Sequence, residues 1–116
     1  MAKYERKLTG NFPSFVGWLH GQIIGASSSA NLEDASDMTL GDVQVAVRVY
    51  ERYSMAGGNR VSMNVTVVGK GSDLFLSAIT AGGSQAVFFK INTIGEETFL
   101  DTCRSAVEAY VSQGRQ

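Results

Sequence analysis

Two stretches near the middle of the chain alternate apolar and polar residues, and this period of two constrains the fold more than any other feature. Successive side chains of a β-strand point to opposite faces, so each stretch predicts a strand with one apolar face. The two stretches flank Gly57-Gly58-Asn59, which predicts an antiparallel hairpin. We expect the apolar face to be the buried one and Val47→Asp to unfold the protein. The residues of that face are Val43, Val45, Val47, Val49, Val61, Met63, Val65 and Val67.

Turn residues divide the neighbouring sequence into further strands of similar length. Glycine-rich turns bound a strand over Leu74 to Thr80 and a last strand over Gln85 to Asn92. The acidic segment around Ser29 to Ser36 predicts an edge strand, where charges discourage pairing with other chains. The polar segment Lys3 to Thr9 predicts a peripheral strand. The strands between residues 29 and 92 are expected to form a meander, and the strand over Lys3 to Thr9 precedes the first helix.

Both ends of this meander are flanked by helical periodicity. Asn11 followed by Pro13 is typical of a helix start, and Gly25 predicts its end. Thr93 and Glu96 fit a capping box for a second helix that ends near Ser112. The predicted buried stripes are Phe12, Phe15, Val16, Leu19 and Ile23 in the first helix, and Phe99, Cys103, Ala106, Val107 and Tyr110 in the second.

These elements predict an α+β fold with one antiparallel sheet of five to six strands in the order β-α-β4-α. The N-terminal helix and the long C-terminal helix pack on one face of the sheet, because only their stripes can cover the apolar face. A chain of 116 residues with 44% hydrophobic residues fits a single domain over residues 1–116.

Composition excludes several kinds of function. The single cysteine excludes disulfides and multi-thiolate zinc sites, and the single histidine leaves no catalytic triad or histidine-rich metal centre. A net charge of -1 gives no electrostatic footprint for nucleic acid or an anionic membrane. We therefore expect no metal and no cofactor. The lack of an apolar segment after the N-terminus predicts a cytoplasmic protein.

Two arginines and a tyrosine alternate on the first central strand, and a third arginine follows the hairpin turn. If the register of the hairpin is as predicted, Arg48, Tyr50, Arg52 and Arg60 share one face of the sheet. Arginine and tyrosine are enriched in binding hot spots, so this group is a candidate partner-binding surface. We then expect alanine at Arg48 and Arg52 to weaken association while barely changing the melting temperature. The alternative is a solvated face whose arginines pair with nearby acids.

The sequence favours a non-enzymatic binding or protein-interaction module, which we expect to form a homo-oligomer through sheet faces or edges. The alternative is a small carrier of apolar ligands, in which Phe99, Cys103 and Val107 line a cavity between the sheet and the C-terminal helix. An enzyme would have to rely on His20 or on the arginine group.

The order of elements resembles the TATA-binding-protein-like fold and a shortened helix-grip fold of the Bet v 1 and START kind. Four segments, residues 41–43, 49–54, 57–62 and 78–92, are similar to a family of small uncharacterised bacterial proteins. This likeness covers nearly the whole chain. It implies a cytoplasmic bacterial protein with a shared fold, and it brings no established activity.

Overall fold

The computed structural model describes residues 1–53, 60–82 and 89–114, with only the backbone of 89–94. Five strands and two helices follow one another along the described chain. They are β1 (Ala2–Thr9), α1 (Phe12–Gly25), β2 (Asn31–Leu40), β3 (Val43–Tyr53), β4 (Arg60–Lys70), β5 (Asp73–Gly82) and α2 (Phe89–Ser112).

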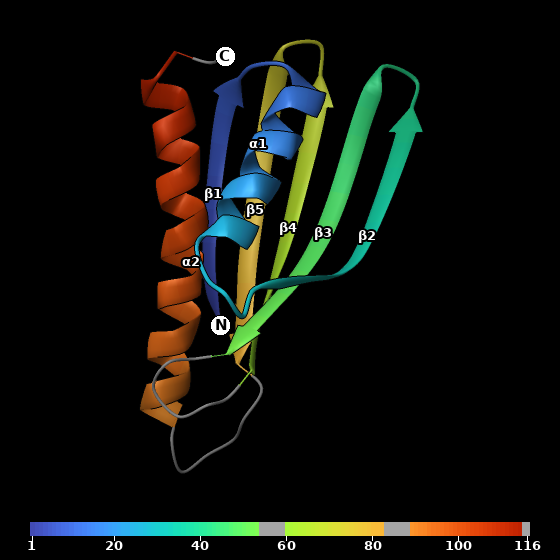
Figure 1. The fold of residues 1–116 in the computed structure, drawn as a ribbon. Helices are drawn as coiled ribbons and strands as arrows, with labels where there is room; N and C mark the ends of the chain where they lie inside the picture. Colours follow the sequence, from blue (N-terminus) through green and yellow to red (C-terminus); the bar gives the residue numbers. More distant parts are fainter. Residues whose placement is uncertain (54–59, 83–88, 115–116) are drawn as a thin grey trace.

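The strands form one antiparallel sheet in the order β1-β5-β4-β3-β2. Both helices lie on one face of this sheet, where α1 also packs against α2 (Figure 1). The predicted α+β class, with four strands between the two helices, is confirmed. The face that carries the helices is called the helix side below, and the opposite face is called the outer face.

The first helix forms as its sequence predicts. Asn11 is the N-cap, and its side-chain oxygen accepts a hydrogen bond of 3.0 Å from the Ser14 backbone N–H. The helix ends at Gly25, and Phe15, Leu19 and Ile23 form its buried stripe. The capping prediction and the helical period are both confirmed.

The second helix starts earlier than predicted. Residues 89–92, expected in a last strand, belong to α2, and the rest of that expected strand (85–88) lies outside the described residues. Glu96 is therefore a buried mid-helix residue and not part of a capping box. Its carboxylate accepts a hydrogen bond from the Gly82 backbone N–H and lies 2.8 Å from the Met1 amino group. Short apolar runs fit either a strand or a buried helix segment, which explains the error.

The valines of β3 lie on the outer face, opposite to the prediction. In an antiparallel ladder, directly paired residues share a face, and Ala46 pairs with Val67 while Tyr50 pairs with Met63. Ala46 and Tyr50 are each only 1% exposed, whereas Val43, Val45, Val47 and Val49 are half-buried. The predicted inward positions of β4, Val61, Met63, Val65 and Val67, are confirmed. The alternating sequence of β3 predicts which side chains share a face, but it does not say which face meets the helices. In the structure, the large Tyr50 side chain lies on the helix side, and the valines lie on the outer face.

Aromatic side chains join the two helices at one end of the core. The rings of Phe15 and Tyr110 meet edge to face with centroids 4.9 Å apart, and the Trp18 indole N–H donates to the Ala106 carbonyl at 3.2 Å. The Tyr110 hydroxyl is buried and has no hydrogen-bond partner among the described residues. This position therefore carries a polar group in an apolar site.

Replacing Tyr110 with phenylalanine is expected to leave the protein as stable as the parent, or more stable by about 1 kcal/mol. A buried hydroxyl without a partner costs roughly 1 to 3 kcal/mol, and phenylalanine keeps the ring contacts while removing that cost. Urea denaturation followed by circular dichroism measures the change. A loss above about 1 kcal/mol would show that the hydroxyl has a partner, such as a buried water.

Candidate functional site

The predicted arginine group does not share one face of the sheet. Arg48 pairs with Val65 and Arg52 pairs with Val61, so both point to the helix side together with Tyr50. Arg60 pairs with Tyr53 on the outer face. The prediction that these four residues lie on one face is therefore wrong. The valines of β3 were expected to face the helices, but Arg48, Tyr50 and Arg52 face them instead.

Arg48 joins β2 to β3. Its guanidinium lies 3.0 Å from the Asp37 carboxylate, and it donates to the backbone carbonyls of Val47 at 3.0 Å and Ser36 at 3.5 Å. Its side chain is only 18% exposed. All three contacts involve one nitrogen of the guanidinium, Nη1, and they connect Arg48 to both strands of the β2–β3 hairpin, which Arg48 therefore stabilises.

Tyr50 and Arg52 contact the helices. The Tyr50 hydroxyl lies 3.0 Å from Nδ1 of the half-buried His20, and burial raises the pKa of this tyrosine to about 12. The Arg52 guanidinium stacks 4.5 Å from the centre of the Phe99 ring, where burial lowers the pKa of the arginine. Both side chains contribute to packing between the sheet and the helices.

Arg60 remains on the surface with acidic neighbours. Its guanidinium forms an ion pair with Glu51 and lies 3.6 Å from a carboxylate oxygen of Glu33. More than half of the arginine side chain is exposed. This arrangement agrees with the alternative reading, in which the arginine pairs with local acids.

The three residues of the predicted cavity belong to the packed core. Phe99, Cys103 and Val107 are fully buried, and they belong to one cluster with side chains of the sheet and of α1. The five main surface hollows of the described residues are lined by other side chains. Burial also raises the pKa of the Cys103 thiol to about 12, so the thiol stays protonated at neutral pH.

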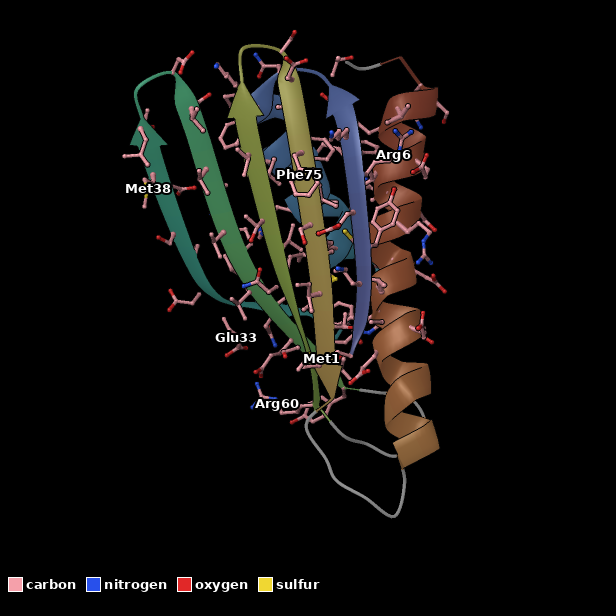
Figure 2. The ribbon with its side chains drawn as sticks, turned by 180° about the vertical axis from the view of Figure 1, so that it is seen from behind. Met1, Arg6, Glu33, Met38, Arg60 and Phe75 are labelled. Atoms are coloured by element: carbon pink, nitrogen blue, oxygen red, sulfur yellow. The ribbon has the colours of Figure 1, made fainter. Side chains whose placement is uncertain are left out.

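An apolar row crosses four strands on the outer face, which neither helix covers. Met38 pairs with Val45, Val45 with Val68, and Val68 with Phe75. Met38 is 52% exposed, and the other three side chains are half-buried. Figure 2, which views the outer face, shows Met38 on β2 and Phe75 on β5. These four residues are called the apolar row below, and Leu40, Val43 and Val47 extend it within β2 and β3.

The two edges of the sheet carry opposite charge. The edge strand β2 holds Glu33, Asp34 and Asp37 with no basic residue, and all ten of its residues are exposed. The opposite edge strand β1 places Lys3, Glu5 and Lys7 on the outer face, a net charge of +1, because they pair with Ile79, Ser77 and Phe75. The prediction of an acidic edge strand is thus confirmed, with shifted bounds.

A hollow of about 430 Å³ lies on the helix side, between α1 and the β2–β3 hairpin. Phe12 and Val16 supply its apolar wall, and Asp37 and Arg48 supply its charges. Asp37 and Arg48 form an ion pair with each other. A charged ligand in this hollow would therefore have to compete with that ion pair. The outer face is therefore the better candidate site.

Comparison with known protein families places nearly the whole chain in one of them. A model described as a family of unknown function, DUF6054, matches residues 1–111. The chain belongs to the DUF6054 family. A comparison with curated proteins finds no match to this DUF6054 member. Membership agrees with the resemblance to uncharacterised proteins and assigns no activity.

Two features are absent from the described residues of this DUF6054 member. No helix there is long and apolar enough to cross a membrane. Within the same residues, no three side chains of histidine, cysteine, aspartate or glutamate gather as metal ligands would.

Proposed function

We propose that this DUF6054 member is a non-enzymatic protein-interaction module that binds its partner through the outer face of the sheet. The apolar row is the observation that carries this proposal. Isolated apolar side chains are common on protein surfaces, but a contiguous group on an uncovered sheet face is typical of an interaction site. The four residues come from four different strands, so the sheet itself holds them in a fixed arrangement.

The chemistry of the described polar groups supports binding over catalysis. The thiol of Cys103 is buried and protonated, and His20 contacts a tyrosine whose pKa is raised. Neither arrangement provides an activated nucleophile. The outer face instead combines an apolar centre with charged borders, which is the usual composition of an interface.

Site-specific photo-crosslinking tests this function. A photoreactive phenylalanine analogue replaces Val45 on the outer face, or Gln44 as the matched control, in cells that make the protein naturally. Gln44 is the adjacent residue of β3, is exposed and points to the helix side. We expect a discrete protein adduct from position 45 and none from position 44. Equal yields from the two positions would overturn the proposal.

A further inference from the structure

We propose that the partner on the outer face is a second copy of this chain, packed sheet on sheet about a two-fold axis parallel to the strands. This inference rests on the proposed function and names the partner that binds the outer face. Three observations support it: the symmetry of the apolar row, the charges of the two edges and the size of the face.

The apolar row is complementary to itself when its direction is reversed. It has a large side chain at each end, Met38 and Phe75, and a valine at each of its two central positions. A two-fold axis parallel to the strands reverses the order of the strands between the copies. Met38 of one copy then meets Phe75 of the other, and Val45 meets Val68, as an interface between identical faces requires.

The charged edges favour this axis over the other two-fold axis in the plane of the interface. With the axis parallel to the strands, the basic β1 edge of one copy lies beside the acidic β2 edge of the other. Lys3 and Asp34 lie at opposite ends of one cross-strand row, which runs through Val49, Asn64 and Ile79. Since the axis that pairs Val45 with Val68 runs between β3 and β4, β2 of one copy faces β5 of the other, and Lys3 lies one strand spacing, about 4.8 Å, to the side of Asp34 of the second copy. An axis perpendicular to the strands would instead place β2 on β2, with the acidic outer edge at Asp34 of one copy against the same edge of the other.

The face is large enough for a specific dimer. Five strands of 8 to 11 residues, spaced by about 4.8 Å and rising roughly 3.4 Å per residue, give a surface of roughly 800 Å². A standard interface buries about 800 Å² on each partner, and stacked sheets lie about 10 Å apart. The polar residues between the valines, such as Asn64 and Thr66, are compatible with this mode of packing, because even homodimer interfaces keep roughly a third of their area polar.

Sedimentation equilibrium tests whether the chain associates through this face. We expect a species of twice the chain mass of 12.4 kDa, and at least tenfold weaker association for Val45→Lys and for Met38→Lys. The matched control is Leu32→Lys, because Leu32 is 40% exposed on the same strand as Met38 but pairs with Tyr50 on the helix side. The control should associate like the parent. If Val45→Lys fails to fold, Met38→Lys decides the result, because its side chain is largely in solvent.

Charge reversal tests the direction of the axis. Lys3→Glu and Asp34→Lys should each weaken dimerisation about two- to fivefold at low salt, and the double variant should regain the parental constant. A dimer that is unchanged in the single variants, or that is not restored in the double variant, would overturn the proposed axis.

The outcomes separate this inference from the proposed function. A monomer at high micromolar concentration, or a dimer insensitive to Val45→Lys and Met38→Lys, overturns the second copy as occupant. A position-45 adduct with a different protein also overturns it, while the proposed function stands. A complete absence of position-45 adducts overturns both.

Discussion

Replacing Val65 with aspartate is expected to unfold the protein, whereas the same change at Val47 on the neighbouring strand leaves it folded. Val65 is 2% exposed in the core between the sheet and the helices, while Val47 is half-buried on the outer face. A buried carboxylate without a partner costs several kcal/mol, and the lost valine adds about 2 kcal/mol. This sum is comparable with the total stability of about 5 to 15 kcal/mol for a domain.

The measurement is far-ultraviolet circular dichroism with a thermal melt on both variants. Val65→Asp should show no cooperative transition, and Val47→Asp should lose only about 1 to 2 kcal/mol, because aspartate is a poor strand former. The pair is its own control, since both changes introduce the same side chain into adjacent central strands. The opposite result, a folded Val65→Asp and an unfolded Val47→Asp, would mean that β3 buries its valines.

Truncating both Arg48 and Arg52 to alanine is expected to lower stability by about 2 to 4 kcal/mol. Arg48→Ala removes the ion pair with Asp37 and two bonds to carbonyls, and Arg52→Ala removes the contact with the Phe99 ring. For a domain of this size the melting temperature should fall by roughly 10 °C. This expectation reverses the one from the sequence, in which both arginines lie on an exposed face.

Arg60→Ala is the control for this pair of changes. Its side chain is 55% exposed, and its ion pairs lie at the surface, so stability should change by less than about 1 kcal/mol. Differential scanning calorimetry on the double variant and on the control measures both effects. A double variant that melts with the parent would mean that the contacts of Arg48 and Arg52 do not contribute to stability.

Most of the fold follows from local patterns in the sequence. The alternation over residues 43–49 and 61–67 predicts the central hairpin, and Asn11 with Pro13 predicts the start of α1. These predictions succeed because each depends on contacts within a few residues. The predicted start of α2 was wrong because the apolar run there fits either a helix or a strand. The burial of Glu96 could not be predicted either, because its carboxylate binds the backbone of Gly82, which is distant in the sequence.

The candidate site was less accessible from the sequence because it depends on which face of β3 meets the helices. The valines and the arginine group were correctly separated onto opposite faces within β3, but the faces were exchanged. Tyr50 carried a usable signal, since a large aromatic residue fills more of a core than a valine does. The apolar row also requires the register of four strands, which brings Met38 and Phe75 onto one line. No local pattern contains that register.

The pairing of β1 with β5 has a consequence for how the chain is made. Ala2 and Thr80 are 78 residues apart, yet the Thr80 hydroxyl donates to the Ala2 carbonyl in the finished sheet. Contacts between such distant residues close late, because a long loop must be ordered before they form. During synthesis on the ribosome, β1 therefore emerges well before the strand that it pairs with. Until β5 has been synthesised, β1 has no neighbour in the sheet, and the sheet cannot be completed.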